Sequence, residues 1–177
     1  HYSLLTTPYS LVMQLIDSHV HLNFDVFAPD LEAVRSRWQA AGVVRLVHSC
    51  VEPAEFASIQ AIAQRFPEVS FAVGLHPLDA HKWTESMFEE IMFLARTEPK
   101  VVAIGEMGLD FYKAENQQQQ RQVFEAQLEI AAALDLPVII HCREASAQAR
   151  EILQSMKQLY GDKIRGVMHC WSGTPEE

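Results

Sequence analysis

The chain has 177 residues, 49% of them hydrophobic and 21% charged, which is enough to build a sizeable core. No apolar stretch is long enough to span a bilayer, so the sequence predicts no membrane role. The formal net charge of −9 excludes nonspecific binding of nucleic acid through a broad basic face. Nucleic acid stays open as a substrate, because bound divalent metal ions supply local positive charge. Three cysteines are too few for a disulfide framework and favour a cytoplasmic location, and nothing indicates an obligate protein partner.

Residues 1–12 precede Met13 and lack the charged start and the cleavage site of a secretory signal. We expect the native start at or near Met13 and assign no function to this N-terminal extension. Residues 13–177 alternate between strand and helix patterns. The predicted strands are 14–21, 43–51, 69–76, 101–106, 137–141 and 165–169, and the predicted helices are 30–41, 53–66, 84–96, 115–134 and 146–160. Thr84 is expected to cap the third helix, and Gln117–Gln120 to lie on the solvated face of the fourth.

This alternation predicts an α/β fold, with a parallel sheet whose strands are joined by helical crossovers. Two architectures compete. A doubly wound open sheet places its ligand at one switch point, whereas a TIM-type (β/α)₈ barrel gathers residues from many strand ends at one mouth. Candidate ligands end the first, fourth, fifth and sixth predicted strands, which favours the barrel. Because such barrels typically have about 250 residues, we expect 13–177 to supply about the first six strands of a barrel truncated at its C-terminus.

Residues of the kinds that bind metal ions lie where these strands end. His19 and His21 are two residues apart, so in a strand they project from the same face as a pair of imidazole ligands. An isolated pair would favour two half-buried histidines bonded to backbone groups instead. Glu106, His141 and His169 at other strand ends favour a metal site. A carboxylate at the end of a buried strand is costly unless cations accompany it, which supports the same interpretation.

Five ordered motifs run along the chain: DSHVHLNF at 17–24, GLHP at 74–77, GEMGLDFY at 105–112, IIHCRE at 139–144 and GVMHCWSG at 166–173. Together they resemble the TatD family of metal-dependent hydrolases, which are usually described as deoxyribonucleases within the amidohydrolase-type barrels. The resemblance runs from about Leu15 to the last residue. The sequence departs from the family at Asn23, where Asp is frequent, at Leu78, where His is frequent, and at Trp171, where Phe is usual.

The resemblance implies a binuclear centre in which His19 and His21 hold one divalent ion, His141 and His169 hold the other, and Glu106 bridges them. Zinc, manganese, magnesium, cobalt and nickel are all compatible with these ligands. The resemblance also implies an aspartate from a Glu-Thr-Asp-type motif on the eighth strand, which this sequence lacks. The catalytic residue is therefore left unassigned.

Other residues are expected around the centre. His76 ends the third strand at the same mouth and is predicted to contact substrate. Arg143 and Trp171 each follow a histidine by two residues, so in continued strands they lie on the histidine side. There the arginine can bind a phosphate and the tryptophan can stack on a base, with a salt bridge and plain packing as the alternatives. Asp110 is predicted to orient its neighbours.

Two cysteines directly follow proposed ligands, Cys142 after His141 and Cys170 after His169. Strand alternation turns them away from the mouth and toward the helices. We therefore expect both to be small core residues and not metal ligands.

Three functional hypotheses follow. A pair of divalent ions suits phosphodiester hydrolysis, because it activates water and stabilises the attacking and leaving oxygens. This favours a deoxyribonuclease whose substrate is nucleic acid, at DNA ends. A D-aminoacyl-tRNA deacylase, or another ester or amide hydrolase on the same site, is the second hypothesis. The third is an inactive truncated fragment.

Overall fold

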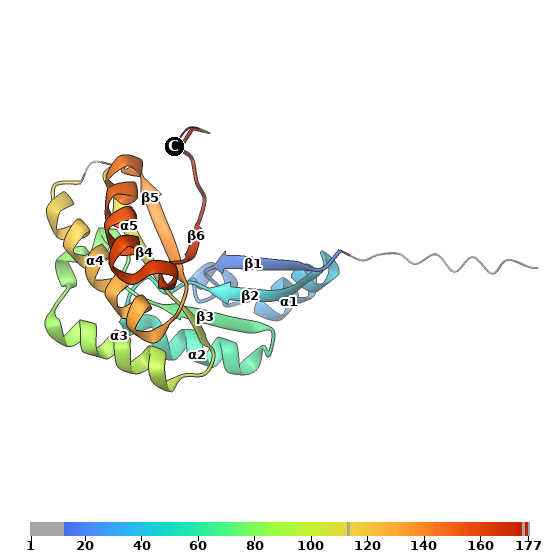
Figure 1. Ribbon diagram of the computed structural model, residues 1–177. Helices are drawn as coiled ribbons and strands as arrows, with labels where there is room; N and C mark the ends of the chain where they lie inside the picture. The colour runs from blue at the N-terminus through green and yellow to red at the C-terminus, as the bar shows by residue number, and fades with distance from the viewer. Residues whose placement is uncertain (1–12, 113, 175, 177) are drawn as a thin grey trace, which may run out of the picture.

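The computed structural model describes residues 13–112, 114–174 and 176, so the extension 1–12 lies outside the described residues. Its centre is a six-stranded parallel sheet in which the strands follow their order along the chain (Figure 1). A doubly wound sheet would reverse the order at a switch point, and this sheet does not. The strands are β1 (Leu15–Val20), β2 (Val43–His48), β3 (Val69–Val73), β4 (Val101–Asp110), β5 (Val138–Arg143) and β6 (Gly166–Met168).

One helix follows each of the first five strands, and together the helices surround the outer face of the sheet (Figure 1). The strands form an open half-barrel, which confirms the predicted barrel-type fold for these six strands. In the described part of the chain, no helix is both long and apolar enough to cross a membrane. The helices are α1 (Leu31–Ala40), α2 (Phe56–Arg65), α3 (Glu85–Thr97), α4 (Gln117–Leu134) and α5 (Ser146–Tyr160), with short 3₁₀ turns η1 (Asp25–Phe27), η2 (Pro53–Glu55), η3 (Pro77–Lys82) and η4 (Gly161–Lys163).

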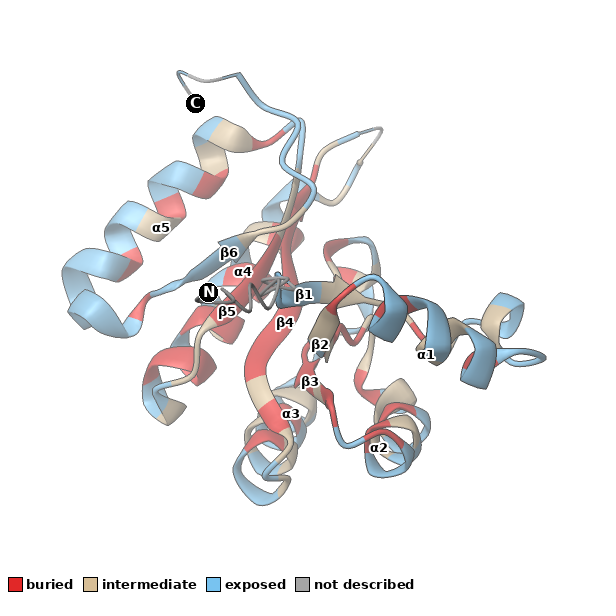
Figure 2. Cartoon of the chain, turned by 90° about the vertical axis from the view of Figure 1, so that its right-hand side faces the viewer, coloured by how far each residue is buried: buried red, intermediate tan, exposed pale blue. Residues whose placement is uncertain are grey.

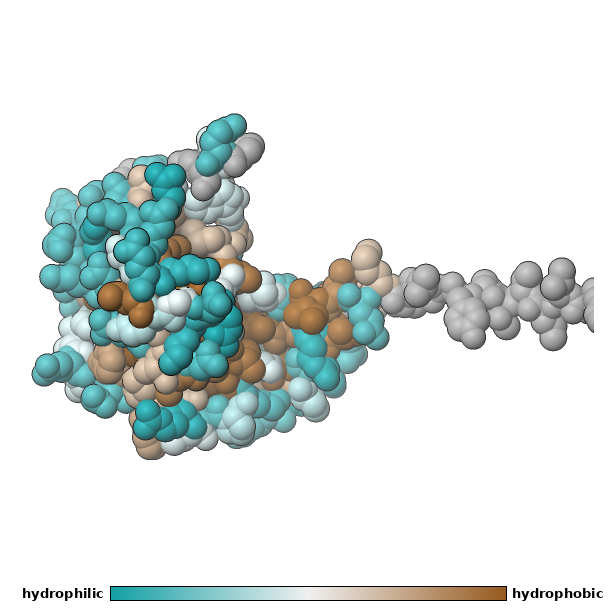
Figure 3. Space-filling view, viewed as in Figure 1, coloured by the Kyte–Doolittle hydropathy of each residue, from teal (hydrophilic) through white to brown (hydrophobic). Residues whose placement is uncertain are grey.

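The sheet is most buried at its middle and most exposed at its edges. Nine of the ten residues of β4 are buried, whereas the first four residues of β1 are exposed (Figure 2). Leu15 and Ile16 contribute to an apolar surface over the N-terminal part of β1 (Figure 3). Among the described residues, β1 and β6 pair on one side only. The strand that carries Glu106 is thus the most enclosed strand, and the strand that carries His19 is an open edge.

Some element boundaries differ from the sequence prediction. The strand predicted to end at Glu106 continues to Asp110, because β4 and β5 stay paired through Asp110 and Arg143. Thr84 caps α3 as predicted, since its Oγ1 accepts the N–H of Met87 at 3.2 Å. Gln120 is buried and bonds to the backbone of Asp110, so its predicted place on a solvated helix face is wrong.

The two cysteines predicted as core residues differ in environment. Cys142 is partly buried and packs against the core, as strand alternation predicts. Cys170 is exposed, with φ of 44°, so the prediction for Cys170 is wrong. Strand β6 already ends at Met168, and alternation has no meaning beyond that point.

Candidate metal centre

Glu106 lies at the centre of the site, with only 3% of its surface exposed. Two glycines of β4, Gly105 and Gly108, let the backbone of strand β5 approach β4 closely on both sides of Glu106. A Cβ on Gly108 would lie 2.0 Å from the carbonyl oxygen of His141, and a Cβ on Gly105 would lie 2.6 Å from that of Ile139. Both glycines also have φ values, 135° and 147°, that residues with a side chain rarely adopt. The local sequence GEMG therefore brings the backbone of His141 directly beside Glu106.

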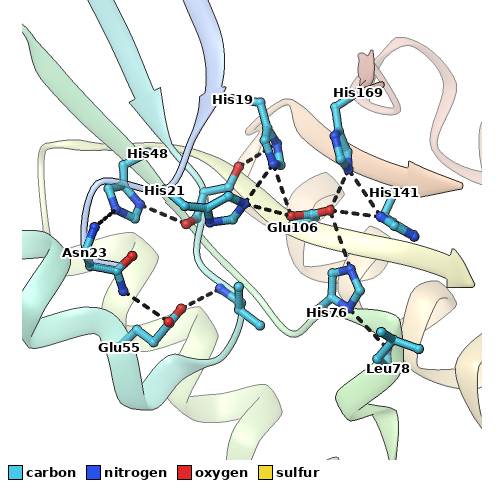
Figure 4. Close-up of polar contacts among 12 residues, drawn as sticks. His19, His21, Asn23, His48, Glu55, His76, Leu78, Glu106, His141 and His169 are labelled. Carbon is cyan, nitrogen blue, oxygen red and sulfur yellow. Dashed lines mark hydrogen bonds and ion pairs between the residues drawn. The ribbon is translucent and has the colours of Figure 1, made fainter. Parts of the chain in front are cut away.

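One carboxylate oxygen of Glu106 faces the histidines of the first motif. Its Oε2 lies 3.2 Å from Nε2 of His19 and 3.5 Å from Nε2 of His21 (Figure 4). The two Nε2 atoms are 3.0 Å apart. Strand β1 and the turn that follows it therefore present two imidazole nitrogens to a single oxygen.

The other carboxylate oxygen faces the histidines from β5 and β6. Oε1 of Glu106 lies 3.1 Å from Nδ1 of His141 and 2.5 Å from Nε2 of His169 (Figure 4). These two ring nitrogens are 3.3 Å apart. The five residues selected from the sequence thus converge at the carboxyl end of the sheet, with one histidine pair on each oxygen of one carboxylate.

The donor set fits divalent metal ions. His19, Glu106 and His169 each offer an atom within 4.8 Å of the others, and so do His76, Glu106 and His141. Nδ1 of His21 and Nδ1 of His169 are buried without a hydrogen-bond partner among the described residues. These atoms lie on the side of each ring away from Glu106, so the nitrogens left to face an ion are the two Nε2 atoms. Imidazole and carboxylate groups gathered at one buried point are ligands for Zn²⁺, Mn²⁺, Co²⁺ or Ni²⁺.

The carboxylate of Glu106 and the histidines around it stabilise one another's charged forms. Burial alone would raise the pKa of Glu106, but its contacts with the surrounding histidines hold that pKa far below its usual range. Burial likewise opposes the charged form of His141, yet its bonds to Glu106 and Asp110 raise its pKa. Glu106 is therefore a carboxylate, and its negative charge is available to cations on both sides.

Asp110 supports His141 from behind. Its Oδ2 lies 3.0 Å from Nε2 of His141, on the opposite side of the ring from Glu106. Its Oδ1 accepts the N–H of Tyr112, and the amide of Gln120 bonds to both its backbone N–H and its carbonyl oxygen. Asp110 is buried and held in place, so it orients His141, in agreement with the sequence prediction.

His76 points a hydrogen-bond donor into the same site. Its Nδ1 accepts the N–H of Leu78 at 3.2 Å, and burial lowers its pKa to about 4. The ring is therefore neutral near pH 7, with its proton on Nε2. This nitrogen lies 3.6 Å from Oε1 of Glu106, beyond hydrogen-bond length but directed at the cluster (Figure 4).

The comparison with known proteins now decides the family. The profile of the family described as TatD related DNase matches residues 16–177. The chain belongs to this family. It is 39% identical over 165 residues to the 3′-5′ ssDNA/RNA exonuclease TatD of Citrobacter koseri, covering 92% of this chain and 62% of that protein. It is 34% identical over 163 residues, with the same coverage, to YabD of Bacillus subtilis, described as an uncharacterized metal-dependent hydrolase.

Solved structures give the same result. The crystal structure of YJJV, a TatD homolog from Escherichia coli, superposes with a TM-score of 0.83 at 32% identity, over 93% of this chain and 62% of that one. A TatD family hydrolase from Entamoeba histolytica, 22% identical with a TM-score of 0.82, shares the fold. The chain thus spans about 62% of the length of the relatives it matches.

Two residues of the TatD motifs make contacts outside the histidine cluster. The guanidinium of Arg143 lies 3.9 Å from the centre of the Tyr112 ring, a cation-π contact at the surface. Trp171 follows β6 and lines a groove of about 430 Å³ with Met168 and residues of α5. The continued strand assumed for Trp171 does not form, because β6 ends at Met168. Substrate contacts by Arg143 and Trp171 stay predictions.

Two site residues of this TatD family chain escaped the sequence analysis. His48 ends β2, Ser49 follows it, and both are fully buried beside His21 and His19. One available signal was their position, because they stand near the carboxyl end of the strand predicted over 43–51, as the proposed ligands do in their strands. A second signal was the polarity of the pair, which directly follows the apolar residues Leu46 and Val47.

Proposed function

We propose that this chain forms the metal-binding part of a divalent-metal-dependent nuclease that hydrolyses phosphodiester bonds of single-stranded nucleic acid. The observation that carries the proposal is the division of Glu106, with one oxygen facing His19 and His21 and the other facing His141 and His169. Such an arrangement suits two ions that share one carboxylate. The names of the relatives, an ssDNA/RNA exonuclease and a metal-dependent hydrolase, support the same class of reaction.

Different residues of the chain bind the ions, orient a ligand and bind the substrate. When bound, divalent ions supply Lewis acidity at a phosphoryl oxygen and raise the acidity of water. Glu106 and the four histidines would hold these ions at the mouth of the half-barrel. Asp110 keeps the ring of His141 turned toward Glu106. His76 offers its neutral Nε2–H to an anionic oxygen of the substrate, where an uncharged donor binds without competing for the metal ligands.

An end-labelled oligonucleotide assay tests the proposal. The purified protein is incubated with Mn²⁺, Mg²⁺ or Zn²⁺ and a single-stranded DNA labelled at either end, with duplex DNA and a D-aminoacyl-tRNA as comparison substrates. We expect stepwise shortening of single-stranded DNA from its 3′ end, abolished by a chelator and by Glu106→Gln. The exposed variant Glu151→Gln serves as the control and is expected to retain activity.

Other outcomes of this assay decide against the proposal. Deacylation of the tRNA without cleavage of DNA would assign the site to an ester hydrolase. Cleavage that persists in Glu106→Gln would show that the centre described above does not perform the reaction.

A further inference from the structure

His48 binds the turn that carries His21. The imidazole is fully buried, and its Nδ1–H donates to the carbonyl oxygen of Ser49 at 2.8 Å. Its other nitrogen, Nε2, is therefore an acceptor and receives the N–H of Leu22 at 2.9 Å. It also receives the N–H of Asn23 at 3.2 Å (Figure 4). These are the two residues that directly follow His21. A side chain of β2 thus fixes the backbone that follows His21, a proposed ligand in the turn after β1.

Ser49 holds the other member of the pair. Its Oγ lies 2.9 Å from Nδ1 of His19, on the side of the ring opposite the nitrogen that faces Glu106. Its backbone N–H donates to the carbonyl oxygen of Val20 at 2.9 Å. Ser49 therefore determines both the rotation of the His19 ring and the path of the strand end next to it.

The same turn has a second attachment through Asn23. Its Nδ2 donates to Oε1 of Glu55 at 3.0 Å, while Oε2 of Glu55 accepts the N–H of Val51 at 2.7 Å. An aspartate at position 23 would place a second carboxylate against Glu55. Asn23 therefore matches Glu55, and the turn after β1 is bound at several points to the segment that follows β2.

We propose that His48 and Ser49 are positioning residues for the His19 and His21 half of the metal centre, a proposal that rests on the proposed metal-dependent function. Histidines that bind metal ions generally donate their other N–H to an oxygen partner, which fixes the ring and increases its basicity. Ser49 is that partner for His19: with Nδ1–H donated to Oγ, the lone pair of Nε2 faces Glu106. His48 acts through the backbone and keeps His21 within reach of the same oxygen.

The test compares metal binding, not turnover, in matched variants. Calorimetric titration of the metal-free protein with Mn²⁺ and with Zn²⁺ measures the affinity of each half. We expect Ser49→Ala to weaken one of two binding events by about 10-fold and Ser49→Thr, which keeps the hydroxyl, to restore it. His48→Leu should weaken the same event, and His48→Gln, which keeps an acceptor, should recover part of the loss. Ser70→Ala on the neighbouring strand β3 is the control and should bind as the wild type does.

A histidine ¹H–¹⁵N correlation spectrum of the Zn²⁺-loaded protein gives an independent readout. We expect His19 as the Nδ1–H tautomer in the wild type and in Ser49→Thr, with loss of the protected Nδ1–H signal in Ser49→Ala. If His48→Leu fails to fold in a thermal melt, the two Ser49 variants still decide. Wild-type affinity of both halves in Ser49→Ala would overturn this inference alone. A wild-type protein that binds neither metal would overturn the proposed function, and this inference with it.

Discussion

The two halves of the candidate metal centre are built differently. His19 and His21 come from β1 and the turn after it and depend on neutral partners, the hydroxyl of Ser49 and the ring of His48. His141 comes from β5, beside the buried strand β4, and has the carboxylate of Asp110 behind it. A carboxylate partner increases the basicity of a ligating histidine more than a hydroxyl does. We therefore expect the half with His141 to bind its metal ion more tightly than the half with His19.

The largest expected effect is that of Glu106→Gln, which removes the carboxylate that both halves of the centre share. The variant keeps the shape of the side chain but loses the negative charge that faces four histidines. We expect metal binding to be lost from both halves, and hydrolysis to fall by about 1,000-fold, or about 4 kcal/mol in transition-state stabilisation. Metal content after dialysis and rates under saturating metal measure this. Retention of either ion would show that the halves do not depend on a common bridge.

Gly108→Ala should displace strand β5, which carries His141, and destabilise the fold. A Cβ at this position meets the carbonyl oxygen of His141, so strand β5 has to shift. Because this clash adds to the strain of a positive φ, we expect the free energy of unfolding to fall by about 3 kcal/mol. Gly161→Ala is the matched control, because its φ is also positive but no atom lies within 4 Å of the added Cβ. Because only backbone strain is involved, it should cost about 1 to 2 kcal/mol in a denaturant titration, less than Gly108→Ala. Equal losses in both variants would mean that the close approach of β4 and β5 is not what Gly108 provides.

Asp110→Asn tests the difference in partners directly. The amide keeps a hydrogen bond to His141 but removes the charge behind it. We expect metal affinity at that half to fall by about 10- to 100-fold, and the affinity at the His19 half to stay unchanged. The exposed variant Asp162→Asn controls for the change in net charge. A smaller effect than that of Ser49→Ala in the same titration would reverse the predicted order of the two halves.

The smallest effect concerns the opposite end of the sheet, which carries none of the proposed ligands. There Arg35 donates two hydrogen bonds to Glu68, and this contact lowers the pKa of Glu68 below its ordinary value of 4.5 even though burial opposes the shift. Because the folded pKa is the lower one, the stabilisation is complete above about pH 4.5 and is lost as the pH falls through the folded pKa. Glu68→Gln should cost about 1 to 2 kcal/mol at pH 7 and should flatten the acid limb of the stability curve. Metal affinities at pH 7 should not change, and a change in only one half would show that the two ends of the sheet are coupled.

Much of the site follows from strand alternation and strand order alone. His19, His21, Glu106 and His141 converge because parallel strands bring their carboxyl ends to one edge, which the sequence pattern already implies. The prediction for Trp171 assumed a strand that continues past His169, and the actual length of β6 depends on pairing that a single sequence does not reveal.

The supporting residues were harder to predict for a different reason. Ser49 reaches His19 only because of the register between β1 and β2, where His48 pairs with Val20. Gln120 looks like part of a polar helix face, but α4 turns it inward to the backbone of Asp110. Contacts of this kind depend on how elements are placed against one another, and periodicity within one element carries no information about that.

The most direct test of the account is the position of the metal ions themselves. Crystals of the protein grown with Mn²⁺ or Zn²⁺ would give an anomalous difference map at the mouth of the half-barrel. We predict two peaks on opposite sides of the Glu106 carboxylate, one beside His19 and His21 and the other beside His141 and His169. A single peak away from Glu106, or metal-saturated crystals without a peak between these histidines, would contradict the central claim that one carboxylate joins two metal sites.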